Sequence, residues 1–373
     1  MREYALVILS VALLTYLTTP LARACAVRIG AVAEVRERDV HSAPTPRLGG
    51  LAMYAGLLAG LLIASALPMM SSVFEGGRQA LALAAAGGIL VVLGVLDDTY
   101  GLDAPTKLAG QAVAATVLAL MGVGLIWVPV GEGVFLLDPL TSVVLTVLIV
   151  LVTVNAVNFV DGLDGLAAGI VGIGALAFFG YCYVLSVEYG LERATLPTLI
   201  SALVVGMTAG FLPANLHPAR LFMGDTGSML LGLLLAASTI SLTGQIDPTV
   251  VPTTSAFAAF LPVLLPLAVI ALPLADMVLA ILRRARRRRL PWTPDREHLH
   301  HQLLRRGHSQ RRVVLLMYAL TAVIAFTAVA TALVPWPWAI TGGAAGLAGV
   351  ALAVRSRTVR RPLSEPRTVA HGR

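Results

Sequence analysis

The sequence predicts an all-α, polytopic membrane protein with about 11 transmembrane helices, its N-terminus outside the cell and its C-terminus in the cytoplasm. Three observations predict this class. Of the 373 residues, 57% are hydrophobic and only 13% are charged, whereas soluble domains carry about 25% charged residues. Apolar runs recur at close to the roughly 20 residues that a helix needs to cross hydrocarbon. Basic residues gather in alternate connections.

Each apolar run is assigned to one helix, because backbone groups that face lipid must be paired within their own segment and no alternating β-barrel pattern is present. In chain order, the spans cover residues 4–26, 49–69, 79–96, 108–128, 139–157, 164–185, 196–214, 227–244, 256–282, 312–334 and 338–354. Together they predict a single transmembrane domain over residues 1–354. Residues 355–373 form a basic tail whose Arg, Pro and Ser content predicts disorder.

The orientation follows from the unequal charge of the connections. One side carries nearly all the arginines, including Arg47 and the run at 283–289, together with Lys107. Between the spans on the other side, only Arg78 and Arg193 are found. The positive-inside rule places the basic side in the cytoplasm. The net charge of +7 therefore needs no nucleic acid as a partner, although the arginine run can also attract a lipid phosphate.

Five segments rich in ligand-type side chains lie at the ends of spans, and each is separated from the next by two spans. They cover residues 41–50, 97–98, 155–165, 217–228 and 295–301. Because two crossings return the chain to the side that it left, all five segments are expected on the cytoplasmic face. A transporter would instead carry its polar residues within spans, often beside broken helices. The pattern favours one cytoplasmic site, with a transporter as the remote alternative.

The adjacent carboxylates Asp97 and Asp98 close a predicted span, at the negative end of its helix dipole. Two anions are unfavourable there unless a cation compensates them. A metal ion, Lys107 or both can provide that charge, and Lys107 is the only lysine in the chain. The alternative is a pair of solvated acids that simply ends the span.

A second polar cluster lies in a glycine-containing turn between two spans. It holds two amides and two carboxylates, Asn155, Asn158, Asp161 and Asp164. Glycine allows a positive φ and a close approach of the backbone to a phosphate. A plain hairpin turn would not need four polar side chains, so the turn is a candidate binding segment.

Asp225 lies at the start of an apolar run and has two alternative interpretations. As an isolated residue it could be a helix N-cap. Asn215, His217 and Arg220 precede it on the same predicted face, however, and a cap does not require them. An oxygen ligand for Mg²⁺ or Mn²⁺ is therefore favoured.

Three histidines, His298, His300 and His301, follow Asp295 within a basic connection. Their spacing includes no cysteine partner and no HExxH pattern, which argues against a zinc site. With many arginines nearby, binding a diphosphate and orienting a sugar is the favoured role. Zinc binding and a plain surface loop stay open as alternatives.

In this order and spacing, the five segments closely resemble the polyprenyl-phosphate N-acetylhexosamine-1-phosphate transferase family, a glycosyltransferase family 4 type that includes phospho-MurNAc-pentapeptide transferase. The resemblance covers roughly residues 36–320. It implies that Asp97 and Asp98 are the paired catalytic aspartates and that Asp225 is the principal Mg²⁺ ligand. It also matches Asn158 and Asp161 to the family's nucleotide-sugar or metal-site turn.

The histidine segment is similar to that of the GlcNAc-1-phosphate branch of this family. The region around His41 departs from the family pattern, because relatives often have a basic residue there. Taken together, the motifs and the resemblance give the following candidates: catalytic, Asp97, Asp98, Asp161 and Lys107; metal-binding, Asp225 and Asn158; substrate-binding, Asn155, Asp164, Arg220, His298, His300, His301 and Arg47.

The resemblance implies a transferase of a bacterial plasma membrane that uses Mg²⁺, or alternatively Mn²⁺. GlcNAc-1-phosphate would pass from UDP-GlcNAc to undecaprenyl or decaprenyl phosphate, with release of UMP and formation of a lipid-linked diphospho-sugar. Direct displacement is favoured over a covalent phospho-aspartate intermediate. The same chemistry on another UDP-N-acetylhexosamine, such as UDP-MurNAc-pentapeptide, is the closest alternative. Whether the chain forms a homodimer stays open.

Overall fold

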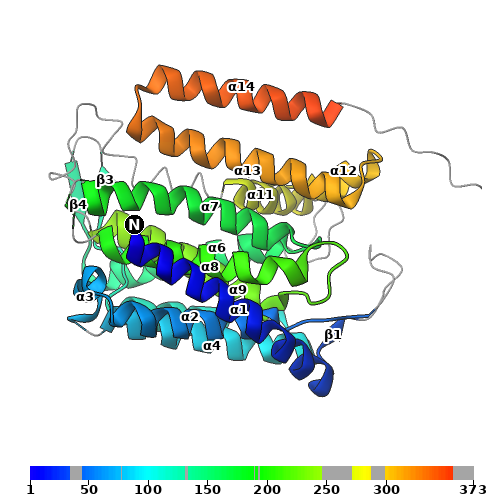
Figure 1. Ribbon diagram of the computed structural model, residues 1–373, viewed down its shortest axis with the longest axis horizontal. Coiled ribbons are helices and arrows are strands. Elements are labelled where there is room, and N and C mark those ends of the chain that lie inside the picture. The colour runs from blue at the N-terminus through cyan, green and yellow to red at the C-terminus, as the bar shows by residue number, and fades with distance from the viewer. Residues whose placement is uncertain are drawn as a thin grey trace, which may run out of the picture.

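The computed structural model is a bundle of long helices that run roughly along one axis (Figure 1). It describes residues 1–33, 44–76, 78–130, 133–188, 190–191, 194–245, 271–286 and 299–355. The helices in chain order are α1 (Arg2–Ile29), α2 (Gly49–Ser65), η1 (Pro68–Met70), α3 (Ser71–Phe74), α4 (Arg78–Tyr100), α5 (Ala104–Leu120), α6 (Pro139–Val160), α7 (Leu166–Tyr183), η2 (Val184–Glu188), α8 (Thr195–Asn215), α9 (Gly224–Gln245), α11 (Ala271–Arg286), α12 (Leu299–Arg305), α13 (Gln310–Leu333) and α14 (Trp336–Arg355).

Eight helices in the described part of the chain are long and apolar enough to cross a membrane. Helix α2 with the short helices η1 and α3 makes a ninth candidate, which is bent by 102° at its break. The shorter helices α5 and α11 overlap the two remaining predicted spans, although residues 256–270 lie outside the described residues. The prediction of an all-α, polytopic membrane protein is confirmed.

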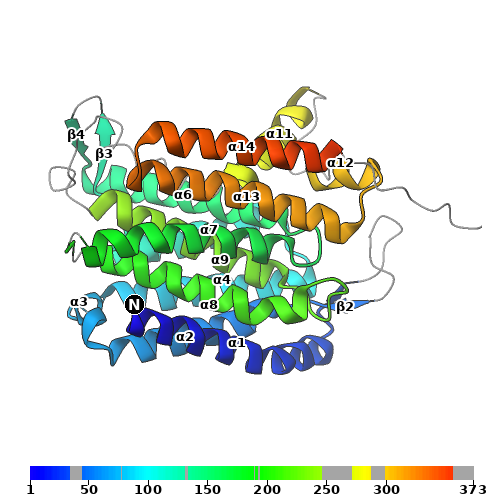
Figure 2. The same ribbon diagram turned by 45° about the horizontal axis from the view of Figure 1, so that its top comes forward.

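Helix α9 is the centre of the bundle and packs against α2, α4, α6 and α8. In α9 and α8, 94% and 83% of the most apolar stretch is buried, against 6% in α14. Helix α14 packs on α13 at the edge of the bundle, which Figure 2 shows clearly. A segment that begins with Asp225 therefore enters the most enclosed part of the molecule.

Small residues let α2 and α4 approach the first turn of α9. A Cβ atom added to Gly50 would lie 2.3 Å from the backbone nitrogen of Gly227, and one added to Gly94 would lie 2.3 Å from the Cα atom of Thr226. Close contact between backbones is how small residues hold helices together in lipid. These two glycines bring the motif segments of α2 and α4 against the start of α9.

Two short hairpins mark the opposite ends of the bundle. Strands β1 (Val32–Ala33) and β2 (Thr45–Pro46) pair at the end where α12 lies, and β3 (Trp127–Val130) and β4 (Gly133–Leu136) pair at the end with the N-terminus (Figures 1 and 2). The last residues of α14 lie at the β1 end. The N-terminus and the end of α14 thus lie at opposite ends of the bundle, as the predicted topology requires.

The span predicted over residues 108–128 differs from the structure at both ends. Helix α5 begins at Ala104 and ends at Leu120. Gly122 then adopts a φ of +100°, which favours glycine and ends the helix. Trp127–Val130 forms a strand, which the apolar composition of the segment did not indicate. The tail from residue 356 onwards lies outside the described residues.

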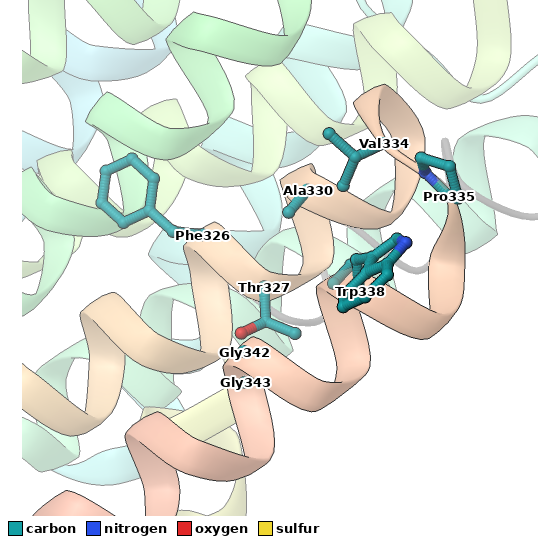
Figure 3. Close-up of a pocket in the computed structure, with 9 residues that line it drawn as sticks. Phe326, Thr327, Ala330, Val334, Pro335, Trp338, Gly342 and Gly343 are labelled. Atoms are coloured by element: carbon teal, nitrogen blue, oxygen red, sulfur yellow. The ribbon is translucent and has the colours of Figure 1, made fainter.

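An apolar pocket of about 510 Å³ lies between α13 and α14, near the turn that joins them (Figure 3). Phe326, Val334 and Trp338 line it, together with Gly342. None of the predicted site residues lines this pocket. The candidate site is instead at the other end of the bundle.

Candidate active site

Lys107 lies between two aspartates that are far apart in sequence. Its Nζ atom donates to Asp97 Oδ2 at 3.1 Å and also contacts Asp225 Oδ2. The backbone N–H of Leu102 donates to Asp97 Oδ1 at 2.8 Å. The three charged side chains are each 14–22% exposed. Of the two compensating cations that the sequence allowed for Asp97, the structure therefore provides Lys107.

Asp98 lies at the first turn of α9 rather than beside the lysine. Its carboxylate accepts hydrogen bonds from Asp225 N and Thr226 N, both at 3.2 Å, and from Thr226 Oγ1 at 2.8 Å. An anion at a helix N-terminus is favoured by the unpaired N–H groups and by the dipole. Gly224 has a φ of +66°, and a Cβ atom there would lie 2.4 Å from Asp98 Oδ2. Asp98 therefore caps a second helix and fixes the start of α9.

Asn158, near the end of α6, joins the turn segment to Asp225. Its Nδ2 atom donates to Asp225 Oδ1 and to Ser228 Oγ, both at 2.9 Å. Asn158 thus orients the Asp225 carboxylate through its amide nitrogen. Its predicted role as a metal ligand stays a prediction.

Asp161 follows α6 directly and is half-buried. Burial raises the pKa of its carboxyl group to about 8, and the negative charges of Asp225 and Asp98 act in the same direction. The positive charge of Arg47 acts against this rise. Asp161 is therefore close enough to both carboxylates to belong to the same acidic site.

Arg47 reaches this site through backbone pairing of its segment with the segment before α9. Phe222 N donates to Pro46 O and Gly49 N donates to Phe222 O, both at 2.9 Å. The Arg47 side chain is exposed. Its position at the rim suits the predicted contact with an anionic substrate.

Asn155 turns away from the carboxylates. Its Nδ2 atom donates to Gln111 Oε1 at 2.7 Å and to Leu151 O at 2.8 Å. Gln111 is buried in α5, and its own amide nitrogen contacts Met229 Sδ. The sequence motifs did not indicate this link between α5, α6 and α9. Gln111 could have indicated it, because it is an isolated amide in an apolar span and lies one helical turn after Lys107.

Asp164 is buried, and its contacts are with the loop before α9. Its Oδ2 atom lies 2.7 Å from His217 Nδ1 and accepts from Ala219 N at 3.2 Å. Arg220, in the same loop, donates from Nη2 to Pro213 O at 3.1 Å. The substrate-binding roles predicted for both residues stay predictions.

The histidine segment is only partly described. His298 lies outside the described residues. His300 and His301 belong to α12, and only the backbone of these two residues is described. Helix α12 packs on α13 at the same end of the bundle as the acidic site. The expected roles of these three residues stay predictions.

The side chains of the site can be matched to the oxygen ligands that a divalent cation needs. The site gathers four aspartates, Asp97, Asp98, Asp161 and Asp225, and Lys107 contacts two of them, Asp97 and Asp225. Within the described residues, no three carboxylate, imidazole or thiolate groups converge as in a site made by protein alone. Mg²⁺ is usually bound through one or two carboxylates together with substrate phosphates. The carboxylates of Asp225 and Asp97, which lie on either side of Lys107, would fit that pattern.

The helices are apolar and of spanning length, and carboxylates, one lysine and amides gather at one end of the bundle. These features define a polytopic membrane protein with a candidate site at that end. The family model described as glycosyl transferase family 4 matches residues 80–243. This range includes the carboxylates of the site and Lys107. The chain belongs to glycosyl transferase family 4.

Relatives from bacteria extend the match over most of the chain. A decaprenyl-phosphate N-acetylglucosaminephosphotransferase of Mycolicibacterium smegmatis is 45% identical over 335 residues, which cover 89% of this chain and 82% of the relative. The Mycobacterium leprae protein of the same name is 46% identical, over 89% of this chain and 84% of the relative. A probable undecaprenyl-phosphate N-acetylglucosaminyl 1-phosphate transferase of Bacillus subtilis is 34% identical, over 86% of this chain and 82% of the relative.

Proposed function

We propose that this protein transfers GlcNAc-1-phosphate from UDP-GlcNAc to a polyprenyl phosphate, with release of UMP. Decaprenyl phosphate is the acceptor in the names of the relatives at 45% and 46% identity, and undecaprenyl phosphate in that of the relative at 34%. Membership of glycosyl transferase family 4 counts against the transporter alternative. The preferred acceptor is accordingly the decaprenyl carrier.

The observation that carries the proposal is the meeting of Asp97, Lys107, Asn158 and Asp225 in one hydrogen-bonded cluster at the end of the bundle. The reaction joins two anions, a lipid phosphate and a nucleotide diphosphate. Neutralising and positioning such groups is the main catalytic requirement of phosphoryl transfer. A lysine held between carboxylates, with Arg47 at the rim, supplies cationic groups at the membrane surface where the two substrates would meet.

In the proposed reaction, an oxygen of the lipid phosphate forms a bond to the β-phosphorus of UDP-GlcNAc. The bond from that phosphorus to the bridging oxygen breaks, and the electron pair leaves with UMP. Lys107 neutralises phosphate charge, and Asp161 holds or releases a proton beside it. A divalent cation on Asp225 would supply further charge neutralisation for the diphosphate. Asp98 keeps the first turn of α9, and with it Asp225, in position.

The site end of the bundle is proposed to face the cytoplasm of a bacterial plasma membrane. Within the described residues, the site end carries many basic side chains and the other end carries few. Those at the site end are Arg23, Arg28, Arg47, Lys107, Arg220, Arg283, Arg284, Arg286, Arg305, Arg306, Arg311, Arg312 and Arg355, and those at the other end are Arg2 and Arg78. The positive-inside rule supports this orientation.

The experiment is a transfer assay with the purified protein, Mg²⁺ and radiolabelled UDP-GlcNAc, in the presence of decaprenyl or undecaprenyl phosphate. The proposal predicts a lipid-extractable labelled product and an equal amount of UMP. Asp225→Asn should abolish both while its melting temperature stays near that of the unmodified protein. Use of UDP-MurNAc-pentapeptide in preference to UDP-GlcNAc would support the alternative donor.

Two further experiments distinguish direct displacement from a covalent intermediate, and a transferase from a transporter. Without lipid acceptor, direct displacement predicts no release of UMP, whereas a stoichiometric burst would indicate a covalent phospho-aspartate. In liposomes, movement of UDP-GlcNAc across the bilayer without any lipid-linked product would contradict the proposed function and favour a transporter. Removal of Mg²⁺ by EDTA should stop transfer, and added Mg²⁺ or Mn²⁺ should restore it.

A further inference from the structure

His217 and Asp164 form a polar pair that the proposed reaction does not use. Asp164 belongs to the turn between α6 and α7, and His217 belongs to the loop between α8 and α9. The imidazole Nδ1 lies 2.7 Å from Asp164 Oδ2. The Asp164 side chain is fully buried, whereas that of His217 is 37% exposed. A buried carboxylate needs such partners, because the charge is otherwise costly to remove from water.

Further hydrogen bonds join the same two segments. Ala219 N donates to Asp164 Oδ2 at 3.2 Å, and Gly165 N donates to Asn215 Oδ1 at 3.1 Å. The Asn215 amide nitrogen in turn donates to Leu221 O at 3.0 Å. Every one of these contacts links the α6–α7 turn to the α8–α9 loop or folds that loop on itself. We call this set of contacts the loop clasp.

Helix α13 supports the clasp from outside. Tyr318 Oη donates to Gly165 O, and Arg311 Nη2 donates to His217 O at 3.3 Å. A side chain of α13 thus holds each of the two segments. The turn and the loop are therefore fixed to each other and to a third, independent helix.

The two clasped segments each deliver a carboxylate to the acidic site. Asp161 lies three residues before Asp164 in the turn, and the loop that contains His217 leads directly into Asp225 at the start of α9. Asp161 and Asp225 are close enough to influence each other electrostatically. A shift of the turn relative to the loop would change their separation directly.

We propose that His217 and Asp164 are positioning residues for the transfer reaction: their contact fixes the α6–α7 turn against the α8–α9 loop and so holds Asp161 in place relative to Asp225. The inference rests on the proposed function. Residues that orient reacting groups typically affect activity by about 10- to 100-fold.

The test compares substitutions that keep or remove the donor at the Nδ1 position. His217→Asn places an amide nitrogen where Nδ1 lies and can still donate to Asp164, whereas His217→Ala cannot. In the UDP-GlcNAc transfer assay, His217→Ala should lower kcat by about 10- to 100-fold with little change in KM for UDP-GlcNAc, and His217→Asn should recover most of the lost kcat. The control is Ser142→Ala, which removes a side-chain hydrogen bond to Leu125 O at the opposite end of the bundle and should leave kcat unchanged.

A double substitution tests whether the two residues act through each other. If they do, His217→Ala combined with Asp164→Ala should lose no more kcat than the more damaging single change. Hydrogen exchange gives a readout that does not depend on turnover. Peptides that cover residues 161–165 and 215–224 should both exchange faster in His217→Ala but not in His217→Asn, even if the Asp164→Ala proteins fail to fold.

Three results would overturn the inference. The first is that His217→Ala changes neither kcat nor KM. The second is that it raises KM with unchanged kcat, which would indicate direct contact with the nucleotide sugar. The third is that His217→Asn and His217→Ala lose kcat equally. Absence of transfer by the unmodified protein would overturn the proposed function instead. In that event, faster exchange of both peptides in His217→Ala would still support the clasp, and unchanged exchange would refute it.

Discussion

Replacing Asp98 with asparagine should destabilise the protein more than the same change at Asp97. The Asp98 carboxylate accepts three hydrogen bonds from the first turn of α9, from Asp225 N, Thr226 N and Thr226 Oγ1. An asparagine has one acceptor oxygen, and its NH₂ group would face donors. Charge-assisted hydrogen bonds contribute about 1.5–3 kcal/mol each against about 0.5–1.5 for neutral ones, and the charge at a helix N-terminus contributes about 0.3–1 kcal/mol.

Three bonds that each lose about 1–1.5 kcal/mol, together with the charge at the helix terminus, give a loss of about 3–5 kcal/mol for Asp98→Asn. Since one kcal/mol shifts the melting temperature of a domain of this size class by about 2–4 °C, the expected decrease is about 6–20 °C. Asp97→Asn loses contacts only with Lys107 and Leu102, so its decrease should be smaller. Both variants should lose transfer activity, Asp97→Asn because its contact with the lysine is weakened and Asp98→Asn because Asp225 is displaced.

The buried thiol of Cys182 offers a direct assay of unfolding in detergent. In a Cys25→Ser background, a thiol-reactive fluorescent dye would report only the exposure of Cys182 as the temperature rises. The reasoning would be refuted if Asp98→Asn melted within about 1 °C of the parent, or if Asp97→Asn were the less stable of the two. Either result would mean that the Asp98 carboxylate does not hold the start of α9.

Three further predictions concern packing, protonation and charge. Gly94→Leu should prevent α4 from packing on α9 and yield aggregated protein in gel filtration, whereas Gly342→Ala, where an added Cβ atom meets nothing within 4 Å, should remain monodisperse. In the folded protein, Asp161 has a pKa raised to about 8. It therefore stays protonated at pH values at which the same group in the unfolded chain has lost its proton. The melting temperature without Mg²⁺ should therefore fall from about pH 5 to pH 8 in the parent, and an equal fall in Asp161→Asn would exclude this group as the cause. Lys107→Met should reduce kcat at least about 100-fold, as expected for loss of a group that stabilises transition-state charge, and near-normal UMP release would contradict its role.

The sequence was sufficient to predict which motifs share one end of the bundle. Apolar runs of spanning length fix the number of crossings between motifs, and an even number returns the chain to the same side. Asp97, Asn158 and Asp225 meet in hydrogen-bond contact as a result. The pattern of spans carries this information because it depends on composition over about 20 residues rather than on any single contact.

The partners of individual side chains could not be predicted in the same way. The position of Asp98 indicated only that it lies at the negative end of its own helix, but the structure directs its carboxylate to the positive end of α9. That contact depends on how closely α4 and α9 pack at Gly94, which no local pattern reveals. Asp164 is a similar case, because its partner His217 lies 53 residues away in another loop.

The proposed function requires the acidic site to face the cytoplasm, where a nucleotide sugar is supplied. Gly162, exposed in the α6–α7 turn, and Leu136, which is 70% exposed in β4, lie at opposite ends of the bundle. Each would be changed to cysteine in a protein with Cys25 and Cys182 replaced by serine, and intact cells would be treated with a membrane-impermeant maleimide. The account predicts that Leu136→Cys is labelled in intact cells and Gly162→Cys only after permeabilisation. Labelling of Gly162→Cys in intact cells would contradict it.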